Sequence, residues 1–124
     1  MQIVSGVDLV EIARVEQAIA RHGEHFLTRI FTFVEREICA GRAESLAARY
    51  AAKEAAAKAL GTGLRGFGFL EIEILRGEQG RPLLALHGAA AEQAQAQGWF
   101  SQSVSLSHNQ SQAIAVVMAL CGDD

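Results

Sequence analysis

The chain has 124 residues, half of them hydrophobic, with one proline, two cysteines and a formal net charge of −3. This composition predicts one domain over residues 1–124 with enough apolar side chains for a core. It argues against nucleic-acid binding, which needs a broad basic surface, and against a membrane span, which needs about 20 consecutive apolar residues. Cys39 and Cys121 fit no metal spacing, and the N-terminus lacks the basic start of a secretion signal. We therefore expect reduced thiols and a cytoplasmic location.

The first third of the chain predicts one strand and two helices. Residues 2–8 are typical of a strand that ends at Asp8, residues 10–21 of an amphipathic helix, and residues 26–31 of a short helix. A capping box pairs a polar side chain with a glutamate three residues later, and both bind backbone N–H groups at a helix start. Two places have this spacing: Asp8 with Glu11, and Thr32 with Glu35.

Arg14 and Arg21 are seven residues apart and therefore share one face of the first predicted helix. Two solvated arginines are the simpler interpretation of such a pair, because exposed charges are common on helices and interact weakly. The functional alternative is a strip of positive charge that docks an acidic partner.

The alanine-rich stretch before Gly61 is the strongest local signal. Alanine is the best helix former and glycine often ends a helix, so we expect a long helix from about residue 43 to Gly61. Its alanines share one half of the helix, which lets a sheet approach closely and places the helix at the centre of the fold. The other half would carry a charged cluster that could grip a phosphate and a metal ion: Arg49, Lys53, Glu54 and Lys58. A solvent-exposed ion pair between Glu54 and Lys58 is an equally good interpretation of this segment alone.

The second half of the chain alternates short strands with turns and one helix. The predicted elements are a glycine-rich loop at 62–68, strands at 70–74 and 83–87, a helix at 88–97, and strands at 101–107 and 113–120. Serines alternate with other residues in the strand at 101–107 and therefore share one face. This order predicts an α+β fold in which an antiparallel sheet packs against the long central helix.

Three residues carry the chemistry that the sequence permits best. Mg²⁺ is commonly held by one or two carboxylates with substrate phosphates, and Asp8 and Glu54 could form such a pair if the long helix crosses the first strand. Lys58, one turn after Glu54, would add positive charge beside the phosphates, which phosphoryl transfer needs. Ser107 and His108 point to opposite faces of a strand, which disfavours a Ser–His dyad. His108 is either a hydrogen-bond donor to an anion or an ordinary turn residue.

Several segments, taken in order, resemble the bacterial holo-acyl-carrier-protein synthases, the small class of 4′-phosphopantetheinyl transferases. The matching segments cover nearly the whole chain: Gly6-Val7-Asp8, Phe31-Thr32-x-x-Glu35, Arg49 to Gly63, Gly80-Arg81-Pro82, and Val104-Ser105-Leu106-Ser107-His108. The long-helix motif is highly specific, whereas each short segment is weak alone. The chain departs from common members between Glu35 and Leu46, where it looks short by a few residues, so a lid there would differ.

The resemblance implies a reaction. Phosphopantetheine would pass from coenzyme A to a serine of apo-acyl carrier protein, as fatty acid biosynthesis requires, and adenosine 3′,5′-bisphosphate would be released. Asp8 and Glu54 would bind Mg²⁺, and Glu54 and Lys58 would be catalytic. The serine proton would go to Glu54 or to a water on the metal, and the sequence leaves both open. By the same resemblance, five residues would bind coenzyme A: Arg49, Lys58, Pro82, Ser105 and His108.

The resemblance also implies partners. Arg14 and Arg21 match the family's cations that face an acidic helix of the carrier protein, and a homotrimer with sites between subunits is typical of the family. The apolar segment 114–117 suits such an interface, although a core strand has the same pattern. The alternatives are the same chemistry on another carrier domain, a non-catalytic trimer that binds a nucleotide-like ligand, and a plain α+β scaffold with a solvated charged helix.

Overall fold

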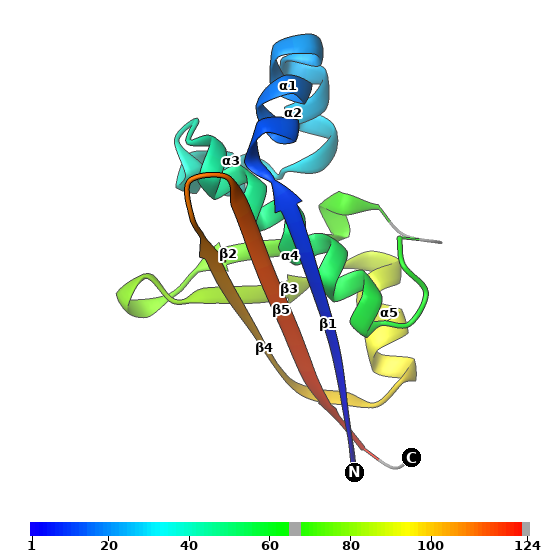
Figure 1. Cartoon of the computed structure of the whole chain (residues 1–124). Coiled ribbons are helices and arrows are strands. Elements are labelled where there is room, and N and C mark those ends of the chain that lie inside the picture. The colour runs from blue at the N-terminus through cyan, green and yellow to red at the C-terminus, as the bar shows by residue number, and fades with distance from the viewer. Residues whose placement is uncertain (65–67, 123–124) are drawn as a thin grey trace.

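The computed structural model describes residues 1–64 and 68–122, and Figure 1 shows their arrangement. A three-stranded antiparallel sheet in the order β1-β5-β4 packs against the long helix α4, and a separate hairpin is formed by β2 and β3. The elements in chain order are β1 (Gln2–Glu11), α1 (Ile12–His22), α2 (Glu24–Ile30), α3 (Phe33–Cys39), α4 (Ala43–Ala59), η1 (Phe69–Glu71), β2 (Ile72–Arg76), η2 (Glu78–Gly80), β3 (Pro82–Leu86), α5 (Gly88–Ala96), β4 (Trp99–His108) and β5 (Gln112–Cys121). The predicted α+β fold with a central helix is confirmed.

Small side chains let α4 lie close to the sheet. β5 is the middle strand and pairs with β1 along its whole length, from Gln2 opposite Cys121 to Glu11 opposite Gln112. Its buried face, on the side of α4, carries Ala113, Ala115, Val117 and Ala119. Alanines of α4 are fully buried, as the sequence predicted, and interdigitation of such short side chains keeps the helix near the strands.

The closest approach of strand and helix is at Gly6 of β1. A Cβ atom built on Gly6 would lie 2.0 Å from the carbonyl oxygen of Ala55 and 2.9 Å from the amide nitrogen of Ala59, both backbone atoms of α4. Only glycine fits this contact. It brings the next residues of β1, Val7 and Asp8, against the last two turns of α4.

The helices α1, α2 and α3 gather at one end of the molecule, at the top of Figure 1. They cover a second apolar cluster whose members include Ile12, Val15, Ile30, Phe31 and Leu46. Cys39 is also buried there, while Cys121 is buried at the far end of β5, and both are free thiols. This matches the expectation of reduced cysteines.

One predicted capping box is confirmed and the other is wrong. At the start of α3 the Glu35 amide donates to the Thr32 hydroxyl at 3.1 Å, and the Thr32 amide donates to the Glu35 carboxylate at 2.9 Å. Asp8, by contrast, lies inside β1, which continues to Glu11 while it pairs with β5. The residue that precedes α1 is Glu11, and its side chain makes no capping bond. Strand pairing therefore overrides the local capping signal.

The face of the sheet opposite α4 is apolar and exposed. Cross-strand pairs on this face include Val7 opposite Val116 and Leu9 opposite Ile114, and Leu9 is 56% exposed. β4 continues each row with a serine, as the sequence predicted, and Ser105 lies opposite Val116. Within the described residues, no helix has both the length and the apolar character to span a bilayer.

Candidate active site

A recess of about 310 Å³ lies between β1, α1, α2 and α4. Its polar lining consists of Asp8 from β1, Arg14 from α1 and Glu54 from α4. Residues that are far apart in the sequence, and that were predicted for a metal and for docking, therefore meet in one place. The meeting depends on β1 crossing α4 at Gly6, two residues before Asp8.

Lys58 adds a cation at the edge of this recess. Its ammonium group donates to the Val7 carbonyl at 2.9 Å and to the Asp8 carboxylate at 3.1 Å. The lysine side chain is 54% exposed and that of Asp8 is 19% exposed, so the ammonium group remains accessible to a ligand. Lys58 therefore forms an ion pair with Asp8 that joins α4 to β1. The sequence had instead suggested an ion pair between Lys58 and Glu54.

Glu54 occupies an electrostatically unfavourable position. Partial burial raises the pKa of its carboxyl group, and repulsion from the Asp8 carboxylate raises it further, while Lys58 acts in the opposite direction. Two carboxylates that repel each other across a solvent-accessible recess would be stabilised by a cation between them. The described residues contain no cluster of three or more potential ligands, so this pair would need oxygen atoms from substrate or water to complete a metal site.

An aromatic wall closes one side of the recess. Phe26 of α2 and Tyr50 of α4 line it, with ring centroids 6.5 Å apart in a stacked arrangement. Behind them, Phe69 lies 5.4 Å from Tyr50, and Phe31 lies 6.2 Å from Phe26. Burial raises the pKa of the Tyr50 hydroxyl, and the carboxylates of Glu54 and Asp8 raise it further. The wall gives the recess an apolar side opposite its charged one.

Two cations of α4 do not face solvent, and for them the predicted exposed cluster is wrong. Lys53 is 0% exposed, and its ammonium group bonds to Glu35 and to two backbone carbonyls. Arg49 is 7% exposed and donates from Nε to the Ile74 carbonyl at 3.1 Å. A helical wheel assigns angles but cannot show that the hairpin β2-β3 and the helix α3 cover this side of α4. Glu54 and Lys58 alone of the four face the recess and its edge.

The other predicted site residues lie away from the recess within one chain. Pro82 begins β3 and lines a groove with Ser101 and Ser103 of β4, and Ser105 is exposed further along β4. His108 is exposed at the end of β4 and lines a separate recess with the carboxylates of Glu11, Glu16 and Glu44. Arg21 is exposed in the last turn of α1. Their roles stay predictions.

Sequence reasoning missed the aromatic wall. Tyr50 precedes Glu54 by four residues, so the spacing alone could have placed its ring on the same face of α4 as the carboxylate. Phe26 carried no comparable signal. Its place in the recess results from the turn between α1 and α2, where Gly23 has a positive φ of 52°.

Comparison with known proteins assigns the family. The sequence-family model of the 4′-phosphopantetheinyl transferase superfamily matches residues 5–117. The chain belongs to this superfamily. A holo-[acyl-carrier-protein] synthase from Herpetosiphon aurantiacus is 51% identical over 125 residues, which cover 95% of this chain and 98% of that protein. One from Chloroflexus aurantiacus is 50% identical over 133 residues, with coverages of 94% and 97%.

Solved structures agree with this assignment. The crystal structure of a Helicobacter pylori holo-[acyl-carrier-protein] synthase in complex with coenzyme A superposes with a TM-score of 0.86 at 35% identity, covering 94% of this chain and 99% of that one. The fold is therefore shared over nearly the full length of both chains.

Proposed function

We propose that this phosphopantetheinyl transferase moves 4′-phosphopantetheine from coenzyme A to a serine of apo-acyl carrier protein, and so prepares the carrier for fatty acid biosynthesis. The observation that carries the proposal is the convergence of Asp8, Glu54 and Lys58 at one recess in a chain of this family. The two relatives described above, which are of nearly the same length, are named holo-[acyl-carrier-protein] synthases.

Mg²⁺ fits the carboxylate pair. Asp8 and Glu54 offer hard oxygen ligands. Burial and, after it, repulsion from Asp8 raise the pKa of Glu54, and a divalent cation would relieve that repulsion. When bound, the ion would supply charge neutralisation for the pyrophosphate of coenzyme A. Because the described residues supply only these two carboxylates to the recess, phosphate oxygens of the substrate would complete the coordination.

The chain's own groups then have distinct tasks. The serine Oγ forms a bond to the β-phosphorus of coenzyme A, and the bond from that phosphorus to the bridging oxygen breaks, which releases adenosine 3′,5′-bisphosphate. The Lys58 ammonium group, held against Asp8, binds the phosphate oxygens and stabilises the charge that develops on them. The Glu54 carboxylate, which lines the recess beside Asp8, accepts the serine proton.

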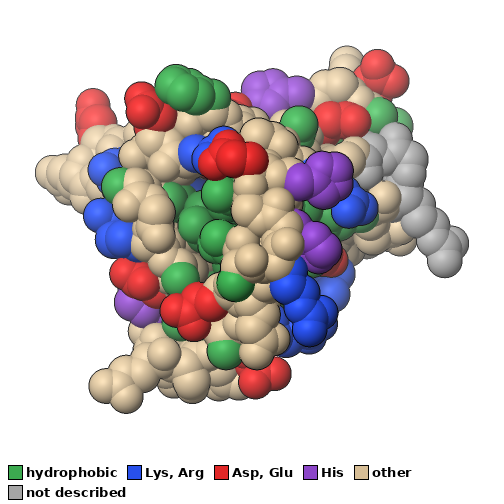
Figure 2. All heavy atoms as spheres, turned by 90° about the horizontal axis from the view of Figure 1, so that it is seen from above, with side chains coloured by type: hydrophobic (Ala, Val, Ile, Leu, Met, Phe, Trp, Pro, Cys, Tyr) green, Lys and Arg blue, Asp and Glu red, His purple; other side chains and the backbone are tan. Residues whose placement is uncertain are grey.

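The carrier protein docks on α1. Arg14 lines the recess, and Arg21 lies seven residues further along the same face of α1. An acidic helix that binds along α1 would therefore pass next to Asp8 and Glu54. Figure 2 views the end of the molecule that carries α1–α3 and shows a group of Lys, Arg and His side chains along one side, with further basic side chains elsewhere on this face. The exposed basic and histidine residues of α1 and α2 are Arg14, Arg21, His22, His25 and Arg29. This local charge lets an acidic enzyme bind an acidic partner.

The proposed binding of coenzyme A depends on the proposed homotrimer. Arg49, Pro82, Ser105 and His108 lie outside the recess of their own chain, which supports a coenzyme site shared between subunits of a homotrimer. The exposed apolar rows of β1 and β5, bordered by the serines of β4, supply a surface suited to burial in such an assembly. A cytoplasmic location is part of the same proposal, and the two buried free thiols are compatible with it.

The direct test is transfer itself. The protein is incubated with apo-acyl carrier protein, coenzyme A and Mg²⁺, and intact-mass spectrometry looks for a phosphopantetheine adduct on the carrier. A carrier with its acceptor serine changed to alanine, and a reaction with Mg²⁺ chelated, serve as controls. An adduct that depends on both the serine and Mg²⁺ is the expected result, and its absence with folded protein would refute the proposal for that carrier.

A further inference from the structure

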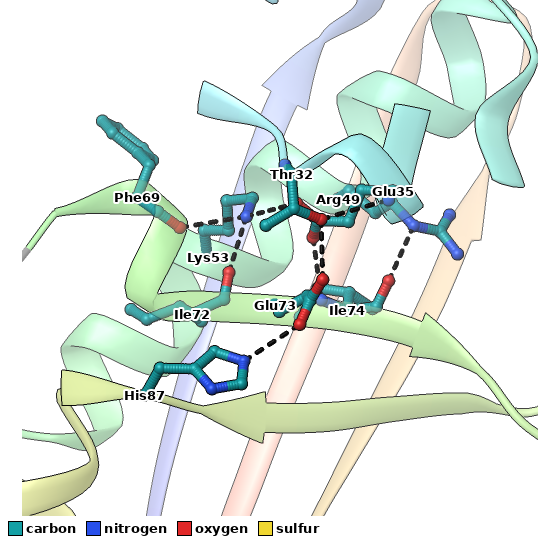
Figure 3. A network of polar contacts seen from close by, with 9 residues as sticks. All are labelled: Thr32, Glu35, Arg49, Lys53, Phe69, Ile72, Glu73, Ile74 and His87. Carbon is teal, nitrogen blue, oxygen red and sulfur yellow. Dashed lines mark hydrogen bonds and ion pairs between the residues drawn. The ribbon is translucent and has the colours of Figure 1, made fainter. Parts of the chain in front are cut away.

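A chain of polar contacts centred on the buried pair of Lys53 and Glu35 joins α4 to α3 and to the hairpin (Figure 3). The Lys53 ammonium group uses all three of its protons: it donates to Glu35 Oε1 at 2.7 Å, to the Phe69 carbonyl at 3.0 Å and to the Ile72 carbonyl at 2.6 Å. Both charged side chains are 0% exposed. Burial lowers the pKa of Lys53, and the Glu35 carboxylate opposes this effect.

Glu35 joins this lysine to the start of α3 and to the hairpin. Its Oε1 also accepts from the Thr32 amide at 2.9 Å, and its Oε2 accepts from the Ile74 amide at 2.8 Å. The Thr32 hydroxyl donates to Glu73 at 2.7 Å, and the other oxygen of Glu73 bonds to His87 at 2.9 Å. Every buried side-chain donor and acceptor in the described residues has a partner, so the network is complete. A complete buried network favours one arrangement of the elements it joins.

The same lysine touches both supports of the wall. Its ammonium group holds the carbonyl of Phe69, whose ring packs against Tyr50. It also lies 5.8 Å from the centre of the Phe31 ring, which packs edge-on against Phe26. Phe26 and Tyr50 are the two aromatic residues that line the recess beside Arg14. The network therefore reaches the wall along two short routes.

The charged side of the recess has separate supports. Asp8 is positioned by the pairing of β1 with β5 and by the contact of Gly6 with α4, and Lys58 bonds directly to β1. None of these contacts involves Lys53 or Glu35. Loss of the buried pair would consequently shift the wall while leaving Asp8 and Lys58 in place.

We propose that the Lys53–Glu35 pair is a positioning element for carrier-protein binding, because it fixes the aromatic wall against which the carrier docks. The proposal rests on the function given above, since it takes the recess beside Arg14 as the place where the carrier binds. Neither residue touches substrate. The pair acts through Phe69 and Phe31 on the two rings that do.

The test is the double variant Lys53→Met with Glu35→Gln. Methionine keeps the aliphatic volume of lysine, and removing both charges avoids a buried charge without a partner, which would unfold the protein for a trivial reason. We expect the KM for apo-carrier protein to rise at least about tenfold, since misplacement of about 1 Å can cost more than that. The KM for coenzyme A and the half-saturating Mg²⁺ concentration should change less than about twofold, and kcat at saturating carrier should be largely retained. Arg42→Met, an exposed cation just before α4, is the matched control and should leave all four constants unchanged.

The outcomes separate the two proposals. If the wild type transfers nothing, the proposed function fails. Calorimetric titration of apo-carrier protein into the wild type and into the double variant then still measures whether Lys53 and Glu35 affect the affinity for the carrier. If the wild type is active and the folded double variant binds carrier normally, or binds carrier, coenzyme A and Mg²⁺ more weakly to the same extent, the positioning role is overturned. Should the double variant not fold, Thr32→Val removes only the bond to Glu73 and the cap of α3, and an unchanged carrier KM in that variant also overturns the role.

Discussion

The contact between Gly6 and α4 predicts a large effect from a single methyl group. In Gly6→Ala the new Cβ would lie 2.0 Å from the Ala55 carbonyl oxygen and 3.0 Å from its carbon atom. These are backbone atoms inside a helix and cannot rotate away. Because carbon and oxygen normally stay more than about 3 Å apart, β1 must retreat from α4 by about 1 Å.

This retreat acts on both stability and chemistry. Overpacking of this kind costs about 1–3 kcal/mol of folding free energy. Lys58 reaches Val7 and Asp8 at 2.9 and 3.1 Å, so a shift of about 1 Å would take both contacts beyond hydrogen-bond distance. It would also widen the separation of Asp8 and Glu54, which face each other from the two moving elements. A loss of about 100-fold in kcat/KM is expected, with a higher half-saturating Mg²⁺ concentration.

The assay measures the transfer rate against Mg²⁺ concentration, together with thermal unfolding, for the wild type and two variants. Gly68→Ala is the control, because a Cβ there meets no atom of the described residues within 4 Å and the φ of −102° suits any residue. Gly68→Ala should match the wild type. A folded Gly6→Ala protein with the wild-type rate and Mg²⁺ dependence would show that the spacing of β1 and α4 does not set the geometry of the site.

Three further predictions concern separate parts of the molecule. Glu54→Gln should abolish Mg²⁺-dependent transfer yet stabilise the apo-protein at pH 7 by up to about 1 kcal/mol, a figure discounted for partial exposure. The pKa of Glu54 is raised in the folded state, so the folded protein holds this proton more tightly than the unfolded chain does. The carboxyl group therefore destabilises the fold as pH rises from the ordinary glutamate range through the raised pKa. The difference in unfolding temperature between variant and wild type should be larger at pH 7 than at pH 4. The double variant Arg14→Ala, Arg21→Ala should have a higher KM for the carrier protein, and that KM should depend less on ionic strength. The reason is that exposed charges are screened within about 10 Å at 0.1 M salt. A wild-type KM for the carrier that does not change with salt would contradict docking through these two arginines. Val116→Lys should shift the protein to a smaller species in sedimentation velocity, and an unchanged mass would exclude the outer sheet face as an interface.

The sequence predicted the elements that local rules control. The alanine-rich helix begins and ends within two residues of its expected bounds, since propensity and glycine chemistry decide both. The Thr32–Glu35 cap is formed, and the alternation of serines along β4 gives the expected exposed face. The order of segments that resembles the family was enough to assign it, because a fold shared over the whole length keeps its motifs in register.

Long-range packing explains what the sequence could not provide. Asp8 has the spacing of a cap, yet β1 runs on to Glu11 because β5 offers it a partner at every residue. Lys53 has the charge of a surface residue, yet Glu35, eighteen positions earlier, makes its burial possible. In both cases the deciding partner is distant in sequence, and no local pattern contains it. Family resemblance carried Asp8 and Glu54 to the site, but it gave no role to Lys53 or Tyr50.

The four charged residues of α4 divide by what the surrounding elements offer them. Lys53 and Arg49 face α3 and β2, which supply a carboxylate and free carbonyl groups, so their charges are satisfied within the protein. Glu54 and Lys58 face β1, where the nearest charge is Asp8. Partial burial and the nearby Asp8 carboxylate together raise the pKa of Glu54. Two carboxylates that repel each other on the accessible side of a helix whose other charges are satisfied within the protein are the physical argument that this side binds a cation and its anionic substrate.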